Sequence, residues 1–402
     1  MVIDCVVVGA GPAGLAASSL LSGLGIEHVV LERGRPGETW RTQRWDSLHV
    51  NNPAFMNTML GAQDPDTYLT PQEVVQRLEE LASRAPVFRG MDVIGLARLD
   101  GRWLLRTSGG QIQARTIVVA TGGENVSRVP ALAGRLPDRI MQRHAATYRK
   151  PSDLPEGAVL VVGSAQSGTQ IAEDLLTAGR RVWLATCPVG RASARYRGRD
   201  TLRWLDEAGF FEHRPEDLPD PQLVRAVPAL RGPLGHDISL QLLAKTGATL
   251  TGRLVAVQRE TLNFDDSTPA NIAYGDRSAA SIRSMIDAHI QAHRLDAPAA
   301  EPDPAEPPIE IDPPRQLHLL SAGIGSVIWC TGYTGAFQWL GEGFTDAAGA
   351  PLRQGPASPA PGIWFIGLRW LIRRSSGNFI GFPRDAEIIA NCIRSFLGAR
   401  VS

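Results

Sequence analysis

The sequence is poor in cysteine and lacks long apolar runs. Its four cysteines, Cys5, Cys187, Cys330 and Cys392, lie far apart, so the chain has no Cys-x-x-Cys pair. Without that pair, a dithiol redox centre is excluded. Isolated thiols in apolar surroundings are typical of a reducing compartment. No stretch reaches the roughly 20 apolar residues that span a bilayer, so we expect no transmembrane segment.

An excess of charge of either sign is also lacking. Lys and Arg together number 41, as do Asp and Glu, and the charges are spread along the chain. Nothing therefore favours nucleic acid as a partner. The chain enters an apolar strand at once and leaves no room for a signal peptide, so we expect a cytoplasmic protein. His289 and His293 lie four residues apart on a predicted helix over 279–295, but no third ligand accompanies them, and we expect no metal site.

A glycine turn follows the first apolar strand. Gly9, Gly11 and Gly14 lie between Val6–Val8 and a helix of small residues. In such a turn the first glycine permits the bend, the second lets the backbone approach a pyrophosphate, and the third lets the helix pack on its strand. A predicted strand over 28–31 then ends in Glu32, the acid that binds ribose hydroxyls in an unphosphorylated adenosine, as in FAD. The alternative is a glycine-rich turn that binds nothing.

A second turn of the same kind follows Val161-Val162. It contains Gly163, Ser164, Gln166, Ser167 and Gly168, with Ala165 in place of the middle glycine. We interpret this turn as the site of a nicotinamide nucleotide, with the phosphates at the helix N-terminus.

The residues after the strand 182–185 favour NADPH over NADH at this second site. Thr186 stands where an acid would repel a 2′-phosphate, and three arginines follow it, Arg191, Arg195 and Arg197. A guanidinium can bind a phosphate through two hydrogen bonds, and we predict this role for Arg191 and Arg195. The alternative is that these arginines form a solvated loop face.

Two further apolar strands end in Thr-Gly and predict how the chain is organised. They are the segments 117–123, with Thr121, and 327–333, with Thr331 and Gly332. We interpret them as crossings between two nested, doubly wound Rossmann-like domains of an α/β protein. The FAD-binding domain would comprise 1–150 plus 331–402, and the inserted NADPH-binding domain 151–330. The segment 297–314 holds seven prolines and is predicted to be extended and exposed.

The chain resembles the flavin-dependent monooxygenases, in particular bacterial flavoproteins related to the N-oxygenating and Baeyer–Villiger enzymes. The resemblance covers nearly the whole length. Besides both glycine turns, it rests on the segments 37–41, 44–49, 120–122, 144–148, 331–333 and 362–368. One family motif is only partly kept: His144 and Tyr148 match it, but Asp138 and Ile140 occupy its Phe and Gly positions.

The resemblance implies two nested dinucleotide-binding domains that hold FAD and NADPH. It implies insertion of one oxygen atom from O₂ into a small organic molecule through a flavin C4a-peroxide, with the protein excluding water. It also implies contacts of Arg33, Trp40, Arg41, Trp45 and His49 with the flavin, although the two tryptophans also fit simple packing. The sequence leaves open which molecule is the substrate and whether the protein forms a homodimer.

Four residues are candidates for the chemistry. Asn51 and Asn52 follow a stretch that in N-oxygenating relatives precedes an asparagine near the flavin, although two asparagines before Pro53 also fit a turn. Gln166 resembles a position at the junction of flavin and nicotinamide, or else a helix N-terminal residue bonded to backbone. Asn378 belongs to a late segment, 373–379, that precedes a predicted helix over 386–396.

Two other functions remain open at this point. An NADPH oxidase or electron-transfer flavoprotein would use the same two cofactors without a protected peroxide. A redox sensor would hold FAD without turnover. Reduction of the flavin by NADPH distinguishes the enzymes from the sensor.

Overall fold

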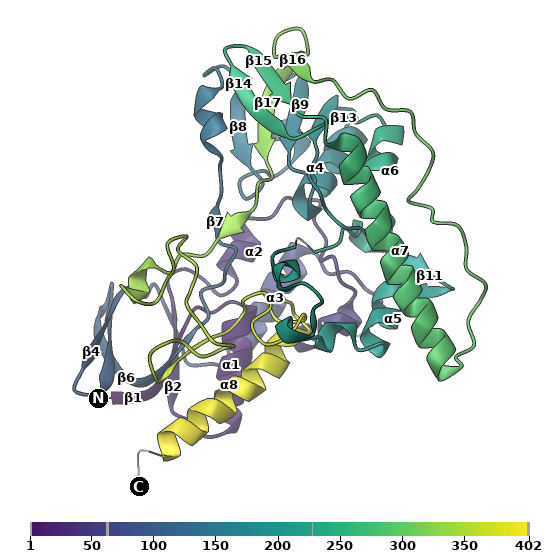
Figure 1. Cartoon of the computed structure of the whole chain (residues 1–402). Coiled ribbons are helices and arrows are strands. Elements are labelled where there is room, and N and C mark those ends of the chain that lie inside the picture. Colours follow the sequence, from purple (N-terminus) through teal and green to yellow (C-terminus); the bar gives the residue numbers. More distant parts are fainter. Residues whose placement is uncertain (1, 62–63, 227, 400–402) are drawn as a thin grey trace.

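The chain forms two largely parallel β-sheets, which lie one after the other along the length of the molecule. The computed structural model describes residues 2–61, 64–226 and 228–399. In Figure 1 the sheet that contains β1 lies at the bottom and the sheet that contains β9 at the top. The predicted α/β class with two Rossmann-like units is confirmed by this arrangement. None of the described helices is long and apolar enough to cross a membrane.

The first sheet gathers strands from both ends of the chain. Its order is β3-β2-β1-β6-β5-β4, and β19 pairs with β6 in parallel. The strands are β1 (Val2–Val8), β2 (His28–Glu32), β3 (Val87–Arg89), β4 (Val93–Leu99), β5 (Arg102–Thr107), β6 (Gly110–Val119) and β19 (Ile363–Phe365). Because β19 joins the sheet after more than 200 intervening residues, the sheet closes only when the C-terminal part of the chain returns.

The second sheet is entirely parallel and lies between the two crossings. Its order is β13-β10-β9-β17-β8. The strands are β8 (Met141–His144), β9 (Ala158–Val162), β10 (Val182–Ala185), β13 (Thr249–Thr251) and β17 (Ile324–Trp329). Since β8 pairs with β17, this sheet begins about ten residues before the domain boundary that we placed at residue 151.

Alternate residues of β9 explain why the second sheet is covered on both faces. Val159 and Val161 belong to one buried cluster, whereas Leu160 and Val162 belong to another. Successive side chains of a strand point to opposite faces, so an unbroken apolar run is needed where both faces are buried. The run Ala158–Val162 meets that requirement, and all five of its residues are buried.

Helices pack on the sheets, and short strands complete the connections. The helices are α1 (Pro12–Gly23), α2 (Glu38–Thr42), α3 (Pro71–Ala82), α4 (Gln166–Thr177), α5 (Thr201–Glu207), α6 (Leu240–Lys245), α7 (Thr268–His293) and α8 (Gly381–Gly398). The remaining strands are β7 (Val126–Ser127), β11 (Arg195–Tyr196), β12 (Arg199–Asp200), β14 (Leu254–Gln258), β15 (Thr261–Phe264), β16 (Gln316–His318) and β18 (Tyr333–Thr334).

Two predicted helices are longer than their apolar patterns indicate. The helix predicted over 279–295 begins at Thr268, and the helix predicted over 386–396 begins at Gly381. In both helices a proline lies within the first three positions, where it removes no helical hydrogen bond. Figure 1 shows α7 running down one side of the molecule, with the chain after it returning beside the helix as an extended trace.

Candidate active site

The first glycine turn connects β1 to α1. Gly9 has a positive φ of 109°, and a Cβ there would lie 2.6 Å from the Ala120 carbonyl oxygen. A Cβ on Gly14 would lie 1.9 Å from the Gly9 carbonyl oxygen, so this position admits no side chain. A Cβ on Gly11, in contrast, would meet no described atom within 4 Å. The turn is thus closed where the helix packs and open where a pyrophosphate would approach.

Glu32 ends β2 beside this turn. Its Oε2 accepts a hydrogen bond from the Ala10 N–H at 2.8 Å, and its Oε1 accepts one from the Gly34 N–H at 2.8 Å. The carboxylate is 8% exposed, so two backbone amides fix a nearly buried acid at the carboxyl end of the strand. That is the position from which an acid reaches the adenosine ribose in this type of fold.

The second turn repeats the geometry of the first. Gly163 has a φ of 103°, and a Cβ on Gly168 would lie 1.8 Å from the Gly163 carbonyl oxygen. The Ser164 Oγ accepts the Cys187 N–H at 2.9 Å, and this bond ties the turn to the end of β10. The side chain of Ser164 is buried and serves the turn itself.

Both turns open onto one cavity of about 2140 Å³. Its lining includes sixteen of the residues that the sequence suggested: Gly9, Gly11, Glu32, Arg33, Trp40, Trp45, His49, Asn51, Asn52, Thr121, Gly163, Gln166, Ser167, Thr331, Gly332 and Asn378. Residues from the two sheets therefore face the same space, although they come from opposite parts of the chain.

The cavity fits two dinucleotides. Each turn leads into a helix of 12 residues, and the first residues of both helices line the cavity. Unpaired amides at such a terminus, together with the helix dipole, stabilise phosphate groups without charged side chains. Beside the first turn, the Thr121 hydroxyl is buried in the cavity lining and has no partner among the described residues. A buried hydroxyl without a partner is expected where a ligand supplies one.

Asn51 connects the two halves of the cavity. Its Oδ1 accepts a hydrogen bond at 2.7 Å from Gln170 on α4, the helix of the second turn. Asn52 differs: its carbonyl oxygen accepts the Asn57 side-chain N–H at 2.9 Å, within a local turn. Asn51 thus contacts the second unit and Asn52 shapes the loop through its backbone, and a place beside the flavin stays a prediction for both.

Gln166 is the first residue of α4 and is paired with backbone. Its Oε1 accepts the Arg231 N–H at 3.2 Å, and its Nε2 donates to the Arg231 carbonyl oxygen. These bonds hold the segment around residue 231 against the second turn. The Gln166 amide is therefore engaged by the protein, and its place at the cofactor junction stays a prediction.

Aromatic residues form one wall of the cavity. The ring centroids of Trp40 and Phe379 are 5.6 Å apart, and Arg44 lies 4.8 Å from the Trp40 centroid. Burial lowers the pKa of Arg44. Asn378 is exposed at this wall, in front of α8. The wall combines aromatic side chains with a few polar groups, as small-molecule sites generally do.

Five of the suggested residues do not line the cavity: Gly14, Arg41, Ser164, Arg191 and Arg195. Gly14 and Ser164 shape their turns, as described above. Arg41 forms an ion pair with Glu79 at 2.5 Å, and Arg195 bonds to the Gly198 carbonyl oxygen. These contacts give Arg41 and Arg195 roles away from the cofactor space.

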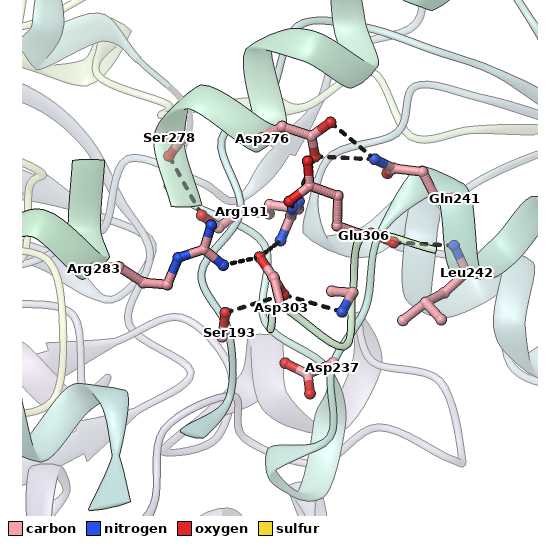
Figure 2. A network of polar contacts seen from close by, with 12 residues as sticks. Arg191, Ser193, Asp237, Gln241, Leu242, Asp276, Ser278, Arg283, Asp303 and Glu306 are labelled. Carbon is pink, nitrogen blue, oxygen red and sulfur yellow. Dashed lines mark hydrogen bonds and ion pairs between the residues drawn. The ribbon is translucent and has the colours of Figure 1, made fainter. Parts of the chain in front are cut away.

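Arg191 lies in a buried network of carboxylates (Figure 2). Its guanidinium is 2.6 Å from Asp303 and 2.7 Å from Asp276, and the Arg191 and Asp303 side chains are each 2% exposed. Arg283 on α7 also pairs with Asp303. This geometry departs from our expectation that Arg191 binds a 2′-phosphate, because its donors are already used by acids.

The same network fixes the proline-rich segment. Asp303 belongs to 297–314, and its contacts with Arg191 and Arg283 hold that segment against the second unit (Figure 2). Burial by itself would raise the pKa of Asp303, but hydrogen bonds from Arg191 and from the Ala305 N–H outweigh it and lower the pKa. The segment is extended, as predicted, but it is anchored by a buried charge.

Three arginines that the glycine turns could not reveal also line the cavity. Arg253 follows β13, Arg277 lies on α7, and Arg374 lies in the late segment 373–379. None forms an ion pair with an acid among the described residues. They reach the cavity from elements far from the turns in sequence, so no local motif could have found Arg253 or Arg277.

Comparisons with known proteins agree with this site. Residues 6–197 match the family model described as pyridine nucleotide-disulphide oxidoreductase. An uncharacterised CzcO-like oxidoreductase from Geobacillus kaustophilus is 27% identical over 98% of both chains. The indole-3-pyruvate monooxygenase YUCCA1 of Oryza sativa subsp. japonica is 33% identical over 44% of this chain and 46% of its own. The flavin-containing monooxygenase of Stenotrophomonas maltophilia superposes with a TM-score of 0.68 at 20% identity, over 99% of this chain and 100% of that one.

The chain is thus similar to flavin monooxygenases in sequence over part of its length and in fold over nearly all of it. These similarities confirm the predicted fold and agree with the predicted resemblance to flavin-dependent oxidoreductases. The two glycine turns fit the predicted cofactor pair, FAD with NADPH, and the similar solved structure of OTEMO is a complex with FAD and NADP. Although the matching family model is described by disulphide reduction, the two cysteines among the described lining residues, Cys187 and Cys330, are far apart in sequence and form no Cys-x-x-Cys pair. Burial raises the pKa of Cys330, and the nearby Cys187 adds to this effect.

Proposed function

We propose that this protein is an NADPH- and FAD-dependent monooxygenase that inserts one oxygen atom from O₂ into a small organic molecule. The observation that carries the proposal is the single cavity onto which both glycine turns open. Within one cavity a nicotinamide can reach a flavin, and the reduced flavin supplies the chemistry that activates O₂. The preferred substrates carry an amine, a sulfur or an activated ring carbon.

In this proposal the residues of the chain bind and orient. Glu32 binds the adenosine ribose of FAD, and the N-termini of α1 and α4 bind the two pyrophosphates. Asn51 is held by Gln170, so its side chain is fixed where the two units meet. Hydrogen-bonding groups fixed in advance act without reorganisation during the reaction.

In this proposal a segment from the second unit shields the cavity from water. The Ser375 N–H donates to the Phe211 carbonyl oxygen at 3.1 Å, and Arg369 donates to the Ala226 carbonyl oxygen at 2.5 Å. Glu212 in the same segment pairs with Arg373 at 2.6 Å. Excluding water in this way protects a reactive oxygen species from wasteful decay.

Recognition of the 2′-phosphate falls to Arg253 and Arg277 in this proposal. Thr251, at the end of β13, pairs with Ala185 of β10, so Arg253 lies at the carboxyl edge of the sheet next to Thr186. Arg277 lies on α7, and both arginines are exposed to the cavity. Two guanidinium groups at this edge suit a dianionic phosphate.

The decisive experiment measures NADPH oxidation, O₂ uptake and hydrogen peroxide release together, with a panel of amines, thioethers and electron-rich aromatic compounds. We expect one panel member to raise NADPH oxidation while lowering the peroxide released per NADPH, with an oxygenated product. Stoichiometric peroxide with every compound would favour an oxidase. A bound flavin that NADPH does not reduce would favour a sensor.

A further inference from the structure

Two neighbouring arginines in the late segment have opposite surroundings. Arg373 is paired with Glu212 at 2.6 Å and lies 3.8 Å from the buried Asp385. Arg374 has no ion pair with any acid in the described parts of the chain, and it lines the cavity, which Arg373 does not. The charge of Arg373 is therefore neutralised by the protein, whereas that of Arg374 is left for something in the cavity.

The Arg374 guanidinium lies between two aromatic rings. Its central carbon is 4.0 Å from the Phe210 centroid and 4.6 Å from the Trp370 centroid. Stacking on two rings fixes the plane of the guanidinium but uses none of its N–H donors. Its Nε is buried without a hydrogen-bond partner among the described residues. A half-buried cation with free donors is a ready acceptor for an anionic ligand.

The backbone around Arg374 is held in place from both sides. The Arg374 N–H donates to the His213 carbonyl oxygen at 2.7 Å. Trp370 has a positive φ of 52° and is 7% exposed, so a bulky residue is kept in the left-handed region. Such conformations cost free energy and persist where the surroundings impose them, often at ligand sites. Burial also lowers the pKa of Arg374, and no acid opposes that effect.

Apolar side chains continue this wall away from the guanidinium. The cavity lining next includes Leu202, Leu205, Phe211, Ile282 and Met285, from α5, the segment after it and α7. Several of them belong to one hydrophobic cluster around Trp204 and Ile286. A ligand that met both features would have an apolar body and an anionic end.

We propose that Arg374 binds the carboxylate of an apolar, aromatic-sized organic acid, which is the substrate class of this cavity. This inference deepens the proposed function. Binding of the acid is argued independently, and only its role as the substrate rests on the proposed function. A planar guanidinium binds a carboxylate through two parallel hydrogen bonds, and the flanking rings of Phe210 and Trp370 contact the body of the acid. The two pyrophosphates are bound elsewhere, at the N-termini of α1 and α4.

The test measures binding to the oxidised, FAD-loaded protein by titration calorimetry near pH 7, without NADPH. The probes are phenylacetate and its neutral analogue phenylacetamide. We expect the wild-type protein to bind the acid at least about tenfold more tightly than the amide. Arg374→Gln should weaken phenylacetate binding by about 10- to 100-fold and leave phenylacetamide almost unchanged. Arg374→Lys should keep part of the preference for the acid.

The matched control is Arg214→Gln, which removes the same charge from an exposed side chain outside the cavity lining. It should leave both affinities unchanged. The proposal is overturned if the wild-type protein shows no saturable binding of phenylacetate, or binds acid and amide equally, or if Arg374→Gln keeps the preference. Arg374 would instead be a flavin-binding residue if the Arg374→Gln protein loses FAD but, once FAD is added back, still prefers phenylacetate to phenylacetamide.

Failure of this proposal is distinct from failure of the proposed function. The titration uses neither NADPH nor O₂, so selective binding of the acid by a protein that oxidises no NADPH would contradict only the monooxygenase proposal. A coupled monooxygenase that ignores the charge of its ligands would contradict only the role of Arg374.

Discussion

The two glycine turns have nearly the same backbone but different surroundings. In both, the last glycine is closed against a carbonyl oxygen, at 1.9 Å for Gly14 and 1.8 Å for Gly168. At the first turn the neighbouring strand ends in an acid, Glu32, held by two amides. At the second turn it ends in Thr186, which is 1% exposed and bonded to Thr251 and Asn271. The backbone thus sets the place of the phosphates, and the side chains at the end of the next strand set which nucleotide fits.

The arginines around the second turn also have similar side chains but different surroundings. Arg191 is close to it in sequence but is buried among acids, where it anchors the proline-rich segment. Arg253 and Arg277 are distant in sequence but exposed in the cavity. Nearness in sequence to the second turn therefore indicates little about which arginine contacts the ligand, because in the folded protein the charge of Arg191 is neutralised by acids.

The largest effect is expected at the middle position of each turn. Gly11→Val should leave the fold intact, since no described atom lies within 4 Å of a Cβ there, but should abolish flavin binding because the side chain occupies the pyrophosphate space. The measurement is the ratio of flavin to protein after purification and reloading. The second turn already has Ala165 at this position, so Ala165→Val should keep the flavin and weaken NADPH instead. Gly23→Ala is the control, and a fully loaded Gly11→Val protein would refute the first assignment.

A large effect on stability is expected from the Arg191 network. Arg191→Gln removes one partner of a buried ion pair with Asp303 and should lower the free energy of unfolding by about 3–5 kcal/mol. Arg195→Gln, at an exposed position of the short strand β11, should change it by less than about 0.5 kcal/mol. Denaturant unfolding of both variants checks the difference, and equal effects would mean that the buried network contributes no more than a surface charge.

The pH dependence of this network follows from the lowered pKa of Asp303. A carboxyl group whose pKa is lower in the folded state adds stability that is complete well above its unfolded value, near 4, and is lost as the pH falls through the folded value. The wild-type protein should therefore lose this contribution only below about pH 4. Unfolding of wild type and Arg191→Gln, compared between pH 7 and pH 3, should show the difference between them shrinking.

A smaller and more selective effect is expected at the edge of the second sheet. Arg253→Gln with Arg277→Gln should raise the Michaelis constant for NADPH by tenfold or more, at about 1.5–3 kcal/mol for each charged hydrogen bond lost, and should leave that for NADH nearly unchanged. The same measurement on Arg195→Gln should show no selectivity. An equal rise for both nucleotides would move recognition of the 2′-phosphate elsewhere.

The smallest effect is expected where the two units meet. Asn51→Asp keeps the size of the side chain and its acceptor for Gln170 but adds a charge to the cavity. We expect NADPH oxidation to continue while the share of NADPH that ends as hydrogen peroxide rises several-fold. Asn52→Asp, whose side chain is not part of this contact, is the comparison, and unchanged coupling in Asn51→Asp would count against its role.

The glycine turns could be predicted, and most of the suggested site residues line the cavity, because their causes are local. A strand, a turn of small residues and a helix follow one another in sequence, and only glycine fits at Gly9 and Gly14. The parallel strands β6 and β17 were also visible as apolar runs that end in Thr-Gly. These features need no knowledge of how distant segments meet.

The surroundings of each arginine in the folded protein could not be predicted in this way. Arg191, Arg253 and Arg374 look alike in sequence, but one is buried against Asp303, one faces the edge of a sheet, and one lies between two aromatic rings. Apart from Trp370, which is close to Arg374 in sequence, their partners come from segments far away along the chain, for which a single sequence offers no periodicity. The start of the second sheet at β8 was hidden for the same reason, since that strand is recognised only by its pairing with β17.

The central claim is that both dinucleotides share one cavity, in which NADPH reduces the flavin. An anaerobic titration of the flavin-loaded protein with NADPH, followed by flavin absorbance, tests it most directly. We expect complete bleaching with one equivalent of NADPH, and return of the oxidised spectrum on admission of O₂. A flavin that stays oxidised under excess NADPH, while the protein still binds that nucleotide, would contradict the account.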